Sequence, residues 1–288
     1  MPFAPNFPVM LRTDDGVRID AAHTPPRRTR GSAVAWTEER RERSDRSDEG
    51  RRRHGSDRAR LCGAEAMNTG LVLAHGFTGS WRERSARRIV HVLSEYGGVV
   101  AFDFRGHGRS GGETTVGDLE ILDVEAAVRH ARVVGYSKIA LVGFSMGAAV
   151  AVRHAALRGG VDAVVSVSGP ARWYYRGTRP MRQVHWAIER PLGRWAARMA
   201  KRTRIARGQW DPIPMPPHEA AALISPTPLL IVHGDADTFF PLDHPHQLYA
   251  GAREPKELWI EPGYGHAESA ATPDLIRRIG KWIASNLS

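Results

Sequence analysis

A chain of 288 residues, 42% of them apolar, is long enough to bury the core of one large α/β domain or two small ones. The single cysteine, Cys62, excludes an internal disulfide framework, and no apolar run approaches the roughly 20 residues that cross a bilayer. The net charge of +10 belongs to two appendages, since residues 25–67 carry +4 and residues 171–216 carry +9, and a specific nucleic acid partner is therefore not expected.

The chain opens with the pattern of a β-hairpin, which we assign to residues 1–24. Residues 9–13 and 17–23 are extended runs around an Asp-Asp-Gly turn, where Gly16 accepts positive φ. Prolines precede any apolar stretch, and there is no charged start of the kind that opens a signal peptide. We therefore expect a cytoplasmic protein.

Residues 25–67 break this pattern. They consist mainly of Arg, Ser, Asp, Glu and Gly, a composition that cannot bury enough apolar surface to offset the entropy of ordering the chain. We predict a disordered insertion there. The functional alternative is an electrostatic tether to acidic partners.

Strand and helix patterns then alternate, as they do in a mostly parallel sheet with helices on both faces. The predicted strands are residues 71–75, 99–104, 139–144, 163–167, 229–232 and 257–260, and the predicted helices include residues 81–95, 118–134, 148–156 and 273–287. Residues 170–217 interrupt the alternation with many arginines and aromatic residues, which indicates an inserted helical lid. The core is thus expected in two parts, residues 68–169 and 218–288.

The pentapeptide Gly-Phe-Ser-Met-Gly at residues 143–147 lies between a predicted strand and a predicted helix. This G-x-S-x-G pattern is typical of a sharp turn that lifts its serine clear of a sheet, and its glycines remove side chains that would clash. Chance would supply such a pentapeptide in on the order of one chain in six, so the flanking strand and helix carry the argument. We predict that Ser145 is a nucleophile; the alternative is a serine that only caps the helix.

A serine nucleophile needs a base within hydrogen-bond reach, and the base needs an acid to orient it. His266 is the predicted base because it follows the last predicted strand in a glycine-rich loop. Asp237, just past the strand before it, is the predicted acid, with Asp235 as its rival. The chain order Ser145, Asp237, His266 is the order that this motif requires.

The other histidines are weaker candidates for the base. His185 in the lid is a competitor, whereas His244 and His246 are predicted at the surface of a helix that begins near Pro241.

The developing oxyanion needs two backbone N–H donors. We predict these from Met146, directly after the nucleophile, and from Phe77, in the loop that follows the first parallel strand. His75 is expected to brace that loop. Trp173 and Tyr174 in the lid are candidate substrate-binding residues. No cofactor and no metal site are expected.

Together these stretches resemble the α/β-hydrolase superfamily, and within it the serine esterases, lipases and S33 aminopeptidase-like hydrolases. The matching stretches are residues 75–77, 102–110, 143–147, 233–237 and 265–266. The resemblance implies the α/β-hydrolase fold, and it implies Asp237 as the acid because the pattern H-G-x-x-D-x-x-x-P is met by residues 233–241. It also implies that Asp103 and Arg105 brace a loop near the active site. The insertion departs from the family, in which a short loop joins the hairpin to the first parallel strand.

The leading hypothesis is a serine hydrolase that cleaves a small-molecule carboxylic ester or thioester through an acyl-enzyme intermediate. Amide or peptide cleavage is the enzymatic alternative. Epoxide hydrolysis and dehalogenation are disfavoured, because related enzymes of those kinds have aspartate where Ser145 stands.

An alternative of another class is a hydrolase scaffold whose basic segments bind a polyanion or an anionic membrane. This alternative rests on the segment 190–207, where basic residues alternate with Leu192, Trp195, Met199 and Ile205 as they do in interfacial helices. The simpler interpretation is that this lid helix packs its apolar side on the core and leaves its arginines in water.

Overall fold

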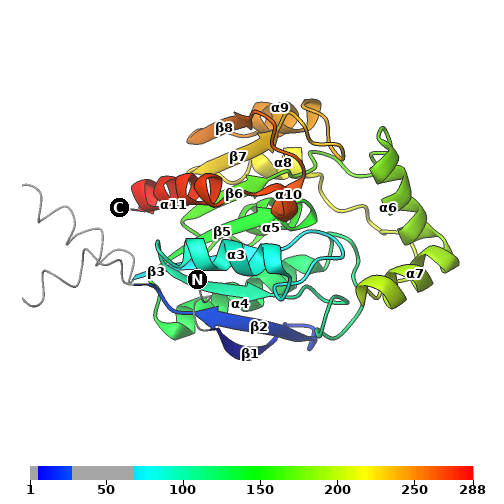
Figure 1. The fold of residues 1–288 in the computed structure, drawn as a ribbon, viewed down its shortest axis with the longest axis horizontal. Coiled ribbons are helices and arrows are strands. Elements are labelled where there is room, and N and C mark those ends of the chain that lie inside the picture. The colour runs from blue at the N-terminus through cyan, green and yellow to red at the C-terminus, as the bar shows by residue number, and fades with distance from the viewer. Residues whose placement is uncertain (1–5, 28–67, 288) are drawn as a thin grey trace, which may run out of the picture.

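The computed structural model describes residues 6–27 and 68–287, and within them eight strands form one sheet in the order β1-β2-β4-β3-β5-β6-β7-β8 (Figure 1). The strands are β1 (Phe7–Arg12), β2 (Arg18–Thr24), β3 (Thr69–Ala74), β4 (Gly98–Phe102), β5 (Lys138–Phe144), β6 (Ala163–Val167), β7 (Leu229–Gly234) and β8 (Lys256–Glu261). The hairpin β1-β2 joins β4 antiparallel, and the remaining neighbours are parallel. The predicted mostly parallel sheet and N-terminal hairpin are confirmed. The predicted disordered insertion lies outside the described residues, apart from residues 25–27.

Helices cover both faces of this sheet (Figure 1). The longer helices of the core are α3 (Arg84–Leu93), α4 (Glu120–Val134), α5 (Met146–Leu157), α9 (Asp243–Gly251) and α11 (Pro273–Leu287), and two short ones are α8 (Pro217–Ala221) and α10 (Ala267–Ala270). One face packs against α3 and α11, the other against α4, α5, α8 and α9.

The central strands are buried because both faces are covered. In β3, Leu71 and Leu73 belong to the cluster with α3 and α11, whereas Val72 and Ala74 point to α4 and α5. Side chains of a strand alternate between faces, so a strand covered twice must be apolar at every position. This is the physical origin of the continuous apolar runs in the sequence.

Two predicted elements are shorter in the structure than in the sequence pattern. The strand predicted to reach residue 104 ends at Phe102, because Asp103 turns inward and its carboxylate accepts hydrogen bonds from Ser80 Oγ at 2.6 Å and from Trp81 N–H at 2.9 Å. The helix predicted from residue 81 begins at Arg84 for the same reason, since Trp81 is held in the preceding turn.

The lid contains α6 (Arg179–Glu189) and α7 (Pro191–Lys201), which lie together at one end of the molecule, set apart from the sheet (Figure 1). The expectation that the lid helix packs its apolar side on the core is wrong for α7. The buried residues of α7 are Gly193 and Ala197, because small residues let this helix approach α6 closely; a methyl on Gly193 would lie 2.4 Å from the Trp186 carbonyl oxygen. The large apolar side chains of α7 point to solvent. Among the described residues, no helix combines the length and apolarity required to span a bilayer.

Candidate active site

Ser145 occupies a strained turn between β5 and α5, with φ of 51° and ψ of −117°. Its two flanking glycines are required by close approach. A methyl on Gly143 would lie 2.3 Å from the Gly147 carbonyl oxygen, and one on Gly147 would lie 2.3 Å from the Ala74 carbonyl oxygen at the end of β3. The turn thus holds the serine at the carboxyl edge of the sheet, where strain of this kind is often tied to function.

The structure brings His266 and Asp237 to this serine. His266 Nε2 lies 2.9 Å from Ser145 Oγ, and His266 Nδ1 lies 2.8 Å from Asp237 Oδ2. An ionised carboxylate only accepts hydrogen bonds, so Nδ1 carries the proton and Nε2 is free to accept from the serine hydroxyl. The ring of Phe239 stacks on the imidazole with centroids 4.2 Å apart, which fixes its plane.

The side chain of Asp237 is fully buried, but its carboxylate accepts several hydrogen bonds. Its Oδ1 accepts hydrogen bonds from the N–H groups of Phe239 at 2.8 Å and Phe240 at 3.1 Å. Burial alone would raise the pKa of this carboxyl, but the hydrogen bond and charge of His266, together with the backbone donor, bring it below its ordinary value. Asp237 therefore remains ionised at neutral pH, as orienting an imidazole requires.

His233 supports the same loop from within the core. Burial lowers its pKa, so the ring stays neutral, and its Nε2 donates to the Phe240 carbonyl oxygen at 2.8 Å. This contact ties the residues after β7 into the turn that presents Asp237.

The rivals considered for the acid and the base lie elsewhere. Asp235 accepts a hydrogen bond from Gly263 N–H at 2.7 Å and is exposed. His185 forms hydrogen bonds with Glu189 and with the Tyr175 carbonyl oxygen within the lid.

The prediction that His244 lies at the surface is wrong. His244 is fully buried and its Nδ1 accepts a hydrogen bond from the Ala171 N–H at 3.0 Å, because α9 packs against the start of the lid segment. His246 is exposed, as expected.

The predicted oxyanion donors lie on two elements beside the serine. A methyl on Gly76 would lie 3.2 Å from Ser145 Cβ, so the loop after β3 adjoins the serine directly. Phe77, which follows Gly76, and Met146, the first residue of α5, both line the pocket at Ser145. Neither backbone N–H is hydrogen-bonded to another residue in the part of the chain that the structure describes. Free N–H groups at a helix start and in an adjoining loop are suited to hold a negative oxygen.

His75 has the bracing contacts expected of it. It is buried, and its Nε2 accepts from the Phe104 N–H at 3.0 Å. Its Nδ1 must then carry the proton, which is donated to the Gly76 carbonyl oxygen at 2.7 Å. The loop that carries Phe77 is therefore fixed at its first residue.

Glu268 is a contact that the sequence analysis missed. Its Oε1 accepts a hydrogen bond from the Gly76 N–H at 2.7 Å across 192 residues of chain, and it lies in the short helix α10 directly after His266. The carboxylate thereby connects the loop of the base to the loop of Phe77. The sequence signal was only a glutamate two positions after a histidine, which many surface loops contain.

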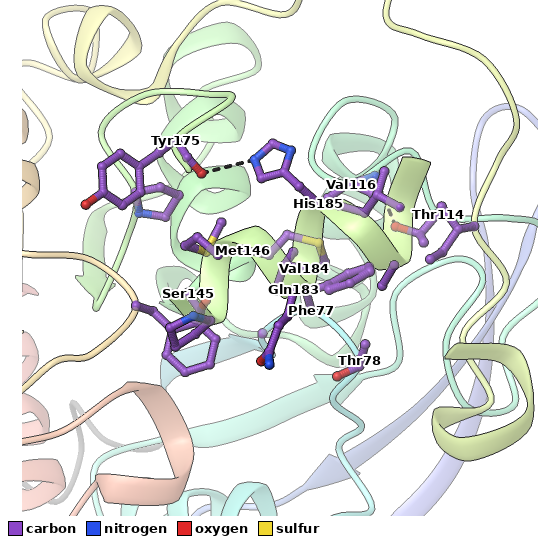
Figure 2. Close-up of a pocket in the computed structure, with 18 of the residues that line it drawn as sticks. Phe77, Thr78, Thr114, Val116, Ser145, Met146, Tyr175, Gln183, Val184 and His185 are labelled. Carbon is purple, nitrogen blue, oxygen red and sulfur yellow. Dashed lines mark hydrogen bonds between the residues drawn. The ribbon is translucent and has the colours of Figure 1, made fainter. Parts of the chain in front are cut away.

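A pocket of about 1100 Å³ opens at Ser145 between the core and the lid. Figure 2 shows Phe77 and Met146 of the core and Val184 of α6 lining it together. Trp173 and Tyr174, the predicted substrate-binding residues, also line this pocket.

Both lid aromatics have structural contacts as well. The Trp173 indole N–H donates to the Pro214 carbonyl oxygen at 2.8 Å, and the rings of Trp173 and Tyr174 both pack against Trp210. Part of the pocket wall is thus an aromatic cluster.

Asp103 and Arg105 brace the site without entering it. Asp103 binds the turn before α3, and Arg105 is buried between the carboxylates of Asp15 and Asp123, with nitrogen to oxygen distances of 2.8 Å and 2.9 Å. Neither residue lines the pocket. Within residues 6–27 and 68–287, no group of three or more His, Cys, Asp or Glu side chains is arranged to hold a metal ion.

Comparison with known proteins gives matches over most of the chain. The model of the alpha/beta hydrolase family matches residues 71–278. The chain is 29% identical over 262 residues to monoacylglycerol lipase of Mycolicibacterium smegmatis, a match that spans 75% of this chain and 88% of the lipase. It is 30% identical over 205 residues to the uncharacterized protein YfhR of Escherichia coli O157:H7, spanning 69% of this chain and 63% of YfhR.

Among solved structures, the esterase Pf2001 of Pyrococcus furiosus has the same fold. It superposes with a TM-score of 0.67 at 21% identity, and the match covers 99% of this chain and 94% of the esterase.

Proposed function

Because the chain belongs to the alpha/beta hydrolase family, we propose that it is a serine hydrolase that cleaves carboxylic esters through Ser145, His266 and Asp237. The observation that carries this proposal is the continuous hydrogen-bonded line from the buried carboxylate through the imidazole to the hydroxyl of a strained serine. The similarity to a monoacylglycerol lipase supports an ester as the substrate.

In the proposed reaction, Ser145 Oγ attacks the ester carbonyl carbon while its proton passes to His266 Nε2. The carbonyl oxygen becomes negative and is held by the N–H groups of Phe77 and Met146, each worth about 3 to 4 kcal/mol in the transition state. Asp237 stabilises the imidazolium and keeps it oriented. Collapse of the intermediate releases the alcohol, which takes the proton from His266, and leaves an acyl group on Ser145. Water, deprotonated by His266, then attacks the acyl-enzyme; the intermediate collapses, the acid leaves, and His266 returns the proton to Ser145 Oγ.

The pocket favours a substrate with a sizeable apolar acyl group. Its volume of about 1100 Å³ exceeds most small-molecule sites, and the aromatic rings of Trp173, Trp210 and Phe239 lie in its wall. A thioester of the same acyl group fits this chemistry equally, because the same carbonyl carbon is attacked.

The nucleophile is tested by labelling with a fluorescent fluorophosphonate, which reacts covalently with an activated serine. Wild-type protein is expected to be labelled and Ser145→Ala is not. Ser85→Ala is the matched control, because Ser85 lines the same pocket but has no base beside it among the described contacts, and its labelling should equal that of the wild type. Full labelling of Ser145→Ala would overturn the proposed mechanism.

The substrate class is tested with p-nitrophenyl esters of increasing acyl length and with the p-nitroanilide of the best acyl group. We expect turnover to rise beyond acetyl, because the pocket is large and has aromatic rings in its wall, and we expect the ester to be cleaved faster than the anilide. Faster anilide cleavage would favour an amidase instead.

A further inference from the structure

Helix α7 exposes its large apolar side chains in a single row. Leu192, Trp195 and Met199 are 64%, 60% and 65% exposed, and they are spaced three and seven residues apart on one face of the helix. We call these three residues the apolar stripe. The opposite side of α7 carries Gly193 and Ala197, which pack it against α6. A soluble helix normally buries its large apolar residues and exposes its small or polar ones, and α7 does the reverse.

The segment around the apolar stripe is strongly basic. Between residues 190 and 210 the chain has seven cationic residues and no aspartate or glutamate: Arg190, Arg194, Arg198, Lys201, Arg202, Arg204 and Arg207. Arg198 and Arg202 are exposed, and neither forms an ion pair with another residue in the described ranges. Exposed cations thus flank the exposed apolar row.

We propose that α7 docks on an anionic lipid surface, with the apolar stripe inserted among the headgroups and Arg198 and Arg202 bound to lipid phosphates. On an anionic lipid surface, such a helix buries its apolar side chains and also attracts its cations to the lipid charge. These two effects together explain both the exposed apolar stripe and the exposed cations. The helix lies with α6 at one end of the molecule, away from the sheet (Figure 1).

Self-association is the less favourable explanation for this face. Paired copies would bring the exposed Arg198 and Arg202 of one molecule close to those of the next, and like charges at an interface are destabilising. A lipid surface supplies the opposite charge.

The docking face and the catalytic pocket are neighbours but do not share residues. The pocket is lined by Arg190 and Lys201, near the two ends of α7, whereas Leu192, Trp195 and Met199 are not in its wall. Docking would therefore place the pocket mouth close to the lipid, and the stripe can be altered without touching the site.

The test is flotation of the full chain with vesicles of phosphatidylcholine alone or with about one third phosphatidylglycerol, a composition that gives a strongly negative surface. We expect binding to the anionic vesicles only, weakened by salt. Trp195→Ser and the double variant Arg198→Gln/Arg202→Gln should each weaken that binding on the order of tenfold. Both variants should hydrolyse a soluble short-chain p-nitrophenyl ester at the wild-type rate.

Matched controls are Val133→Ser, which removes an 84% exposed apolar side chain on α4, and Arg253→Gln, which removes an exposed cation before β8. Both should bind vesicles like the wild type. The inactive Ser145→Ala should also bind normally, so docking and the proposed ester hydrolysis can fail independently.

Three outcomes would overturn the proposal. The first is equal binding to neutral and anionic vesicles. The second is a loss of vesicle binding in the control variants as large as that in Trp195→Ser. The third is a protein that does not bind vesicles, sediments as a dimer, and becomes a monomer on Trp195→Ser. The last result would assign the apolar stripe to a second copy of the chain.

Discussion

Replacing Gly147 by alanine should uncouple the two predicted oxyanion donors from each other. The added methyl would lie 2.3 Å from the Ala74 carbonyl oxygen and 2.5 Å from the His75 carbonyl oxygen, both backbone atoms at the end of β3. Since such contacts do not occur below about 3.0 Å, the start of α5 must move away from β3 by roughly 0.7 Å. Met146 belongs to α5 and Phe77 to the loop after β3, so this movement separates their N–H groups.

The magnitude follows from what one donor contributes. Loss of a single oxyanion donor lowers kcat by about 10²-fold to 10³-fold, or ~3 to 4 kcal/mol, and we expect Gly147→Ala to fall in that range. The same overpacking should lower the free energy of unfolding by about 1 to 3 kcal/mol. Steady-state turnover of a p-nitrophenyl ester and thermal unfolding measure the two effects separately.

Gly70→Ala is the matched control for this prediction. This variant also adds one methyl, but at the start of β3, far from the serine, where it would lie 2.9 Å from the Tyr136 ring. It should destabilise the fold and leave kcat within about twofold of the wild-type value. A folded Gly147→Ala protein with wild-type kcat would refute the reasoning. An equal loss of kcat in Gly70→Ala would attribute the effect to general destabilisation.

Three further predictions address the acid, the connecting carboxylate and a buried histidine. Asp237→Asn should lower kcat about 10⁴-fold while Asp235→Asn leaves it within about twofold, and similar losses in both variants would contradict the assignment of the acid. Glu268→Ala should lower kcat about tenfold, whereas Glu268→Gln, which keeps an acceptor for the Gly76 N–H, should retain most activity; equal losses would exclude a positioning role. Burial, aided by the charge of Arg172, lowers the pKa of His244 to about 4, so the unfolded chain binds its proton first as pH falls below about 6.5. Stability should therefore drop by about 1 kcal/mol between pH 6.5 and 5.5 in denaturant titrations, and an unchanged slope in His244→Asn would show that this residue is not responsible.

The sequence pattern predicts well those helices and strands whose ends depend on neighbouring residues in the chain. The helix predicted at residues 273–287 is α11 (Pro273–Leu287), and the strand predicted at residues 163–167 is β6 (Ala163–Val167). Apolar period and length identify such elements without knowledge of what packs on them. The strand end at Phe102 was missed because it depends on partners of Asp103 that lie outside the strand.

The candidate site divides in the same way. Ser145, Asp237 and His266 were chosen from the sequence, because each follows a recognisable strand and the carboxyl ends of parallel strands meet at one edge. The structure then separated Asp237 from Asp235 by direction: only Asp237 turns its carboxylate to the imidazole.

The sequence pattern alone thus determined the succession of strands and helices along the chain, the serine turn, and the two predicted partners of the serine, since these depend on short-range spacing. Tertiary structure alone decided that Glu268 reaches Gly76, that His244 is buried and that α7 turns its apolar stripe outward. The physical reason is that burial and hydrogen-bond partners depend on which surfaces meet, and residues that meet across the sheet edge are far apart in the chain. In α7, the face with the small residues Gly193 and Ala197 packs against α6, and the face with Trp195 is exposed. The spacing of apolar residues along the helix does not predict which of its two faces is buried.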